Sequence, residues 1–329
     1  MNLPLFPTVT QRGGCKTWRA MLTLLLALVA QASFCAELRI MPLGDSITQA
    51  LSDQLSYRYR LWVKLLNVGA DFAFVGSLDS NVSGNPVWPD HLGRSFDRHH
   101  EGHAGARSDE IASALPGLMS GYIPDVVLMH LGTNDVLQGR SIDETVVDLM
   151  QIIDLLRARN ARVAILLATL IPTTYFPQND RITDLNALIR GIVLEKNTPQ
   201  SPVILVDQSA GFDVLADAAD GVHPSASGEG KMARKWFEAL QLFLVKSNAV
   251  VNAEGYLTLS FSRLNNAAHL TYTVELSDDL LEWNSGVGNT VEVGVTDNGT
   301  GSESVVMRDE QSVHTAPRRF IRLRLDYAR

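Results

Sequence analysis

The sequence predicts an α/β domain with a doubly wound parallel sheet, followed by a small β domain. Between residue 38 and about residue 247, short apolar runs alternate with stretches whose apolar residues recur at helical spacing. From Gly255 onward, apolar and polar residues alternate with period two between clusters of turn residues. We therefore expect an α/β domain at 37–248 and an accessory β domain at 249–329, both following an N-terminal segment at 1–36.

Five apolar runs in the first domain are typical of buried parallel strands. They cover residues 39–43, 72–76, 125–132, 162–172 and 203–207. Helices are expected at 57–67, 142–159, 181–196 and 224–246. Ser141 and Glu144 fit a capping box, and Pro224 suits the first turn of a helix. This order predicts a three-layer α/β/α, flavodoxin-like sheet.

The predicted second domain contains five runs with period two, which favour an antiparallel β-sandwich. These runs cover residues 256–263, 270–276, 291–295, 305–308 and 320–325. No catalytic constellation is visible in them, although Trp283 lies in a polar turn. A carbohydrate-binding role and a spacer or surface-attachment role both remain open, and we favour the second.

The first 36 residues have the pattern of a secretory signal peptide. Basic residues, ending at Arg19, precede an apolar run at 21–30, and small residues follow near Ala32 and Ala36. The run is short for a membrane span, which needs about 20 apolar residues. We therefore expect a secreted, cell-surface or periplasmic protein without a transmembrane segment in its mature form. An uncleaved anchor and a lipoprotein modified at Cys35 are the alternatives.

The net charge restricts the binding partners of the protein, and the cysteine content restricts its disulfide bonds. The formal net charge is −8, and residues 1–36 carry three basic and no acidic residues, which leaves −11 on the rest. This balance argues against nucleic acid or an anionic membrane as a partner. The two cysteines, Cys15 and Cys35, both lie in the expected signal peptide, so no intramolecular disulfide is expected in the mature protein.

Three polar motifs follow predicted strands or begin the last helix: 44–46, 132–135 and 220–223. Carboxyl ends of parallel strands meet at one sheet edge, so these motifs should converge. A serine, Ser46, could then be activated by His223, with Asp220 orienting the imidazole and Asn134 donating to an oxyanion. On its own Ser46 could equally be a helix N-cap.

These motifs resemble those of the GDSL serine esterases, also called SGNH hydrolases. Within that group the chain is most similar to carbohydrate esterase family 3, the acetylxylan esterases. The stretches that carry the resemblance are 40–48, 56–59, 74–77, 100–103, 131–136 and 220–224. The nucleophile-elbow motif Gly-x-Ser-x-Gly of α/β-hydrolases does not occur in the sequence.

The resemblance implies the SGNH hydrolase fold and a role for each matching residue. Ser46 is implied as the nucleophile, His223 as the base and Asp220 as its orienting carboxylate. The backbone N–H groups of Ser46 and Gly105 and the amide of Asn134 are implied as the oxyanion hole. One departure is Ala106, because the family pattern has an aromatic residue after the glycine.

Further candidates surround these motifs. Asp45 and Asp135 lie beside the nucleophile and the oxyanion motif, as local hydrogen-bonding anchors or substrate contacts. Trp88, in the long polar loop 77–104, is a candidate for stacking on a sugar ring. His130 interrupts an apolar strand, which favours a hydrogen-bonded core histidine. Trp62 is expected in the core.

We expect no cofactor and no metal. The loop histidines and their acidic neighbour lack the spacing of a zinc protease, and a hydrogen-bonded loop at the rim of the site is the preferred interpretation. These residues are His91, His99, His100, Glu101 and His103.

The expected function is hydrolysis of O-acetyl esters on a plant polysaccharide or oligosaccharide by an acyl-enzyme mechanism. A lipase, lysophospholipase or thioesterase of the same fold is one alternative, and it would need a broad apolar acyl channel. A non-catalytic carbohydrate-binding surface module is the other.

Overall fold

The computed structural model describes residues 37–327, except for residues 246, 266, 269, 300 and 317. The expected signal peptide, with Cys15 and Cys35, lies outside the described residues. Within the described ranges, no helix combines the length and the apolarity that a bilayer crossing requires.

The first domain is built on a parallel sheet with the strand order β2-β1-β4-β5-β6, the predicted flavodoxin-like order. These strands are Phe72–Phe74, Leu38–Gly44, Val126–His130, Ala164–Ala168 and Val203–Val206. A short strand, β3 (Glu101–Gly102), pairs with the last two residues of β1. Because β1 pairs with β4 in parallel up to Gly44 and His130, both strands end at the same edge.

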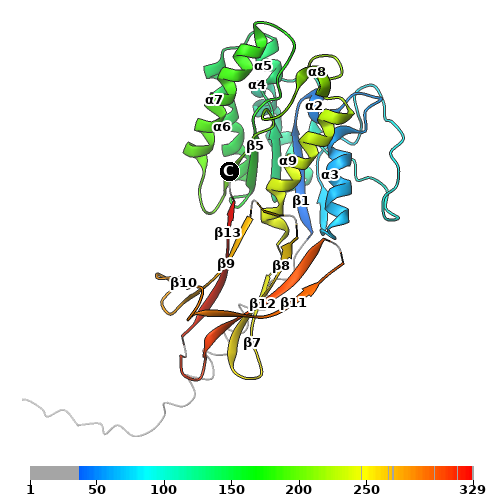
Figure 1. The fold of residues 1–329 in the computed structure, drawn as a ribbon. Coiled ribbons are helices and arrows are strands. Elements are labelled where there is room, and N and C mark those ends of the chain that lie inside the picture. Colours follow the sequence, from blue (N-terminus) through cyan, green and yellow to red (C-terminus); the bar gives the residue numbers. More distant parts are fainter. Residues whose placement is uncertain are drawn as a thin grey trace, which may run out of the picture.

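Helices cover both faces of this sheet, which gives the expected three layers (Figure 1). On one face lie α3 (Ser56–Asn67) and α9 (Ala226–Leu244). On the other lie α4 (Ser108–Leu118), α6 (Ile142–Arg159) and α7 (Gln178–Lys196). Side chains of a strand point alternately to the two faces, so each strand contributes to both cores.

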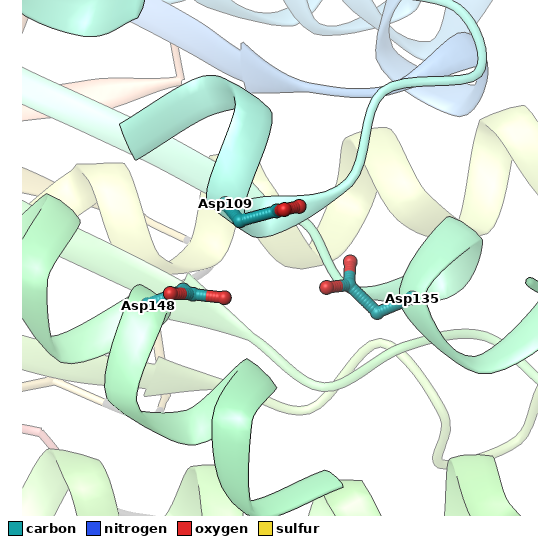
Figure 2. A group of neighbouring side chains, drawn as sticks. All are labelled: Asp109, Asp135 and Asp148. Atoms are coloured by element: carbon teal, nitrogen blue, oxygen red, sulfur yellow. The ribbon is translucent and has the colours of Figure 1, made fainter. Parts of the chain in front are cut away.

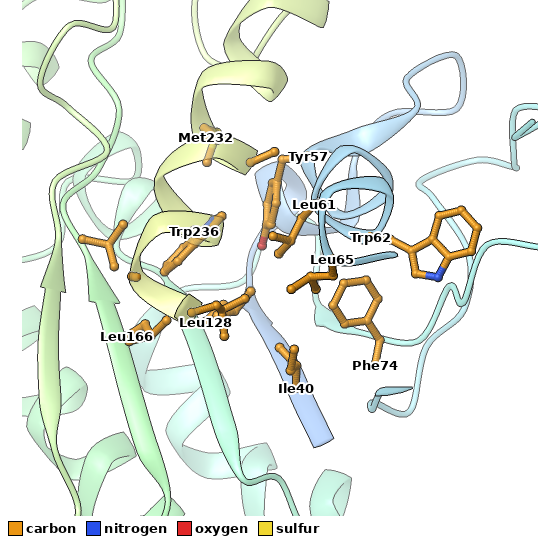
Figure 3. Packing of buried hydrophobic residues seen from close by; sticks show 14 of the residues in the cluster. Ile40, Tyr57, Leu61, Trp62, Leu65, Phe74, Leu128, Leu166, Met232 and Trp236 are labelled. Carbon is orange, nitrogen blue, oxygen red and sulfur yellow. The ribbon is translucent and has the colours of Figure 1, made fainter. Parts of the chain in front are cut away.

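The core under α3 and α9 is partly aromatic, as Figure 3 shows. The rings of Tyr57 and Trp236 lie 6.3 Å apart and join the two helices. Leu128 of the central strand is fully buried beneath them. Trp62 is buried as expected and stacks on Tyr59 at 5.9 Å.

Three very short helices begin where the chain leaves the sheet or approaches α9: α2 (Ser46–Gln49), α5 (Thr133–Leu137) and α8 (Val214–Asp217). The first two directly follow β1 and β4, and a 3-10 turn, η1 (Met119–Gly121), follows α4. Figure 1 shows α2, α5 and α8 at the end of the domain farthest from the β domain.

The β domain contains a four-stranded sheet, β11-β12-β8-β7, and a three-stranded sheet, β10-β9-β13, all antiparallel. The strands are Ser247–Val251 (β7), Tyr256–Leu264 (β8), Leu270–Ser277 (β9), Asn284–Ser285 (β10), Thr290–Asp297 (β11), Ser302–Ser312 (β12) and Phe320–Tyr327 (β13). A small core contains Leu259, Phe261, Val274 and Val305. Residues of β8, of the start of β1 and of the end of α9 line a cavity of about 350 Å³.

Several local expectations are corrected. The expected domain boundary at 248/249 falls inside β7, which begins at Ser247. Ser141 precedes α6 but makes no side-chain capping bond, so the capping box is absent. The last helix begins after Pro224, with Ser225 as its capping residue. Helix α4 was not expected, because Pro116 and Gly117 interrupt its helical pattern.

Replacing Leu128 by Ala should lower the free energy of unfolding of the α/β domain by about 2–5 kcal/mol, because it leaves a cavity in the central core. Urea denaturation followed by circular dichroism measures this change.

The control is Val147→Ala, on the exposed side of α6, which should change the same quantity by less than about 0.5 kcal/mol. Equal effects of the two substitutions would contradict the packing described here.

Candidate active site

Ser46 stands at the carboxyl end of β1, as the first residue of α2. The residue that caps this helix is Asp45, whose Oδ1 accepts the N–H of Ile47 at 2.9 Å. The N-cap interpretation of Ser46 is therefore excluded. Gly44 permits the sharp turn, since a Cβ there would collide with Thr48 and with the carbonyl of His130.

The turn before α9 brings a histidine onto Ser46. His223 Nε2 lies 2.9 Å from Ser46 Oγ, and its Nδ1 lies 2.7 Å from Asp220 Oδ2. The other oxygen of Asp220 accepts the N–H groups of Val222 and His223. Burial alone would raise the pKa of Asp220, but these hydrogen bonds lower it, so the carboxylate stays ionised beside the imidazole.

A third segment, the loop before α4, lies beside α5. Asn134 Nδ2 donates to the carbonyl of Ala106 at 3.1 Å, and Gln138 Nε2 donates to the carbonyl of Gly105 at 3.0 Å. From the other side, Gln49 Oε1 accepts the N–H of Ala104 at 3.0 Å. Gly105 is thus held between the nucleophile helix and α5.

The two expected backbone donors are free for a ligand. Among the residues that the structure describes, neither the N–H of Ser46 nor that of Gly105 takes a hydrogen-bond partner. The N–H of Ser46 lies in α2, that of Gly105 in the loop before α4, and the Asn134 amide in α5. A tetrahedral oxyanion requires donors of this kind.

The structure confirms Asp45 and Asp135 as local hydrogen-bonding anchors and corrects the alternative of substrate contact, because both side chains are fully buried. Asp135 accepts the N–H and the hydroxyl of Ser108, at 2.9 and 2.5 Å, and so ties α5 to α4. Burial raises the pKa of Asp45 to about 6, although the N–H of Ile47 and the charge of His223 act in the opposite direction.

Asp135 also belongs to an acidic group with Asp109 and Asp148, which Figure 2 shows at the meeting point of α4, α5 and α6. Arg140 approaches all three carboxylates, at 2.7 Å for Asp148 and about 3.5 Å for the other two. Arg107 adds a second cation on Asp109 at 3.0 Å. The group is therefore an internal ion-pair network, with its charge compensated by protein side chains.

The loop histidines each have a protein partner. His103 Nε2 bonds Glu101 at 2.7 Å, His99 bonds Asp97 at 2.8 Å and His91 bonds Asn67 at 2.7 Å. His100 is buried and accepts the N–H of Gly102. These bonds agree with a hydrogen-bonded loop.

Trp88 is half-buried and His130 fully buried. Trp88 donates its ring N–H to the carbonyl of Leu55 at 2.8 Å and packs on Phe96 at 5.3 Å, so part of its surface serves the loop itself. His130 is fully buried, but its ring nitrogens have no partner among the described residues, which corrects the hydrogen-bonded interpretation. Burial lowers its pKa to about 4, which keeps the ring neutral at neutral pH.

Sequence reasoning missed the side chains that hold the nucleophile segment. Arg58 is fully buried and donates to the carbonyls of Thr48, Gln49 and Arg98, so it fixes the end of α2 against the long loop. A charged residue among the apolar positions of the expected helix 57–67 was the available signal. For Gln138, the signal was its position four residues after Asn134, on the same face of a helix.

A further contact joins the serine and histidine segments. Glu229 of α9 accepts the N–H of Ser56 at 2.9 Å and the guanidinium of Arg60 at 3.0 Å. The carbonyl of Pro224, next to His223, accepts a bond from Gln54 at 2.9 Å. These bonds hold the segment that follows the nucleophile helix against α9 and the turn that carries His223.

Comparison with known proteins identifies the family of the chain. The model of the GDSL-like Lipase/Acylhydrolase family matches residues 43–231. A multidomain esterase of Ruminococcus flavefaciens is 29% identical over 251 residues, which are 69% of this chain and 31% of that protein. The chain spans 31% of this curated relative and 55% of a second one.

Two solved structures are similar over the α/β domain. A family 3 carbohydrate esterase of Clostridium thermocellum is 31% identical, with a TM-score of 0.54 over 64% of this chain and 98% of its own. An acetyl esterase, solved as a serine-to-alanine mutant with an acetate ion, is also 31% identical, with a TM-score of 0.56 over 63% and 98%. The resemblance predicted from the motifs is confirmed.

The raised pKa of Asp45 predicts a pH-dependent stability difference for Asp45→Asn. Between about pH 4 and pH 6 the folded protein holds a proton that the unfolded chain has released, so wild-type stability falls as pH rises through this window. The variant, which keeps the capping oxygen, should gain up to roughly 3 kcal/mol over wild type above pH 6 and little below pH 4.

Urea midpoints of both proteins at pH 4, 5, 6 and 7 measure this gain. A difference between the two proteins that stays constant over these pH values would show that Asp45 titrates normally in the folded state.

Proposed function

Since this chain belongs to the GDSL-like lipase/acylhydrolase family, we propose that it is a serine esterase that removes O-acetyl groups from a polysaccharide such as xylan. The observation that carries the proposal is the hydrogen-bonded series Asp220–His223–Ser46, with distances of 2.7 and 2.9 Å. A serine activated in this way attacks ester carbonyls.

In the proposed reaction, Ser46 Oγ attacks the carbonyl carbon while His223 Nε2 accepts the serine proton. The N–H groups of Ser46 and Gly105 and the amide of Asn134 donate to the developing oxyanion. His223 then returns the proton to the departing sugar oxygen, which leaves acetyl on Ser46. Water, deprotonated by His223, releases acetate and regenerates the serine. Asp220 keeps the imidazole in the required tautomer and stabilises its charged form.

The names of similar proteins support an acetyl group on a glycan as the substrate of this chain. One is named as an acetyl esterase with an acetate ion, and another as a family 3 carbohydrate esterase. The polar loop 77–104 also disfavours a broad apolar acyl channel. We propose further that the protein is exported, since residues 1–36 have the pattern of a signal peptide.

Ser46→Ala should abolish acetate release from acetylated xylan and hydrolysis of p-nitrophenyl acetate, because the nucleophile is lost while the fold is kept. An acetate assay and circular dichroism measure the two properties.

Undiminished hydrolysis by the folded variant would remove Ser46 from the mechanism. A preference for acyl chains of eight or more carbons would replace the acetyl-glycan substrate by a lipid.

Asn134→Ala should lower kcat by a factor of about 10²–10³ if its amide donates to the oxyanion. Steady-state kinetics with p-nitrophenyl acetate measure this loss.

Gln138→Ala is the matched control, because Gln138 holds the neighbouring carbonyl of the same loop from the same helix. Its kcat should fall by less than about tenfold. Equal losses in the two variants would mean that Asn134 acts only by holding the loop.

A further inference from the structure

Two exposed aromatic residues are consecutive in the segment between β5 and α7. Phe176 is 75% exposed and Tyr175 is 49% exposed. In the described part of the chain, these are the only exposed side chains among phenylalanine, tyrosine and tryptophan. Exposed apolar patches rimmed by polar residues often mark a binding surface.

This segment is fixed to the turn that carries the catalytic histidine. Thr173 Oγ1 and the N–H of Thr174 both donate to the carbonyl of Gly221, at 2.7 and 3.0 Å. Gly221 lies between Asp220 and His223 in the chain, and a Cβ on it would collide with the Thr174 side chain. The two rings therefore follow directly on residues that touch the Asp220–His223 turn.

The other side of the segment is tied to α7. Asn179 Oδ1 accepts the N–H of Thr173 at 3.0 Å, and the N–H of Asn179 donates to the carbonyl of Tyr175 at 2.9 Å. Bonds on both sides hold the backbone under the rings. A held backbone lowers the ordering cost of binding on a loop.

We propose that Tyr175 and Phe176 form a subsite that stacks on a pyranose ring of the acetylated glycan beside His223. This inference rests on the proposed function and names where the sugar binds. A flat aromatic face fits the apolar C–H face of a sugar ring, and the tyrosine hydroxyl offers a hydrogen bond. The subsite adds to the candidate Trp88, whose N–H already donates to the carbonyl of Leu55 and whose ring packs on Phe96.

Two other exposed apolar side chains of this domain lack these properties. Leu194 is 74% exposed on the outer face of α7, and Val147 is 63% exposed on α6. Both are aliphatic and stand in regular helices rather than beside the catalytic turn. Isolated side chains of this kind are normal on protein surfaces.

The first experiment measures binding without turnover. Xylohexaose is titrated into the Ser46→Ala protein by isothermal calorimetry, and the titration is repeated with Tyr175→Ala and Phe176→Ala together in that background. The double substitution should weaken binding by about tenfold or more. The matched control, Leu194→Ala in the same background, should bind as the parent does. Unchanged binding after the double substitution, or no binding by the parent, would overturn the subsite.

The second experiment compares two substrates in the otherwise wild-type protein. Replacing both aromatic residues should lower kcat/KM for acetylated xylan relative to kcat/KM for p-nitrophenyl acetate by about tenfold. An unchanged ratio would also overturn the subsite. Failure of the proposed function is distinct, because it would show as no Ser46-dependent hydrolysis of either ester in the unsubstituted protein.

Discussion

The hydrogen bond between His223 and Ser46 depends on a parallel sheet whose strands end at a common edge. Ser46 follows β1, Asn134 follows β4, and His223 lies in the turn before α9. β1 and β4 are neighbours in the sheet. Between them, the direction in which successive strands are added to the sheet reverses, and open α/β sheets bind their ligands at such a point. The chemistry of the site thus follows from the topology of the sheet.

The sheet in turn requires two apolar faces. Met41 and Leu43 of β1 pack under α4 and α6, whereas Ile40 packs under α3 and α9. Strands buried on both faces are continuous apolar runs, and their last residues must supply any polar chemistry. Polar motifs at strand ends were therefore the most informative part of the sequence.

Most of the fold and the central part of the site could be predicted from the sequence, because both depend on local patterns. Apolar runs predicted the strands, and the motifs around Ser46, Asn134 and His223 marked the sheet edge. Contacts between distant residues were not predictable in the same way. The bond from Gln138 to Gly105 spans 33 positions, and that from Trp88 to Leu55 also spans 33. Nothing in either local sequence specifies such a partner.

Burial explains the remaining errors. Asp45 and Asp135 were expected as hydrogen-bonding anchors or substrate contacts, and their buried carboxylates act as anchors of short helices. His130 was expected to be hydrogen-bonded, yet as a neutral ring it occupies an apolar face of the sheet. Residue type alone does not show which side of a strand or turn a side chain occupies.

The hydrogen bonds of Glu229 join α9 to α3, and this contact bears on how the site forms during folding. Ser46 and His223 are 177 positions apart, so the nucleophile meets its base only after α9 has docked beside α3. Contacts between such distant segments close a large loop, and the loss of chain entropy delays them. Catalytic competence therefore requires this long-range contact to form. Recovery of activity after dilution from denaturant reports the docking of α9, whereas the pairing of β1 with β4 can precede it.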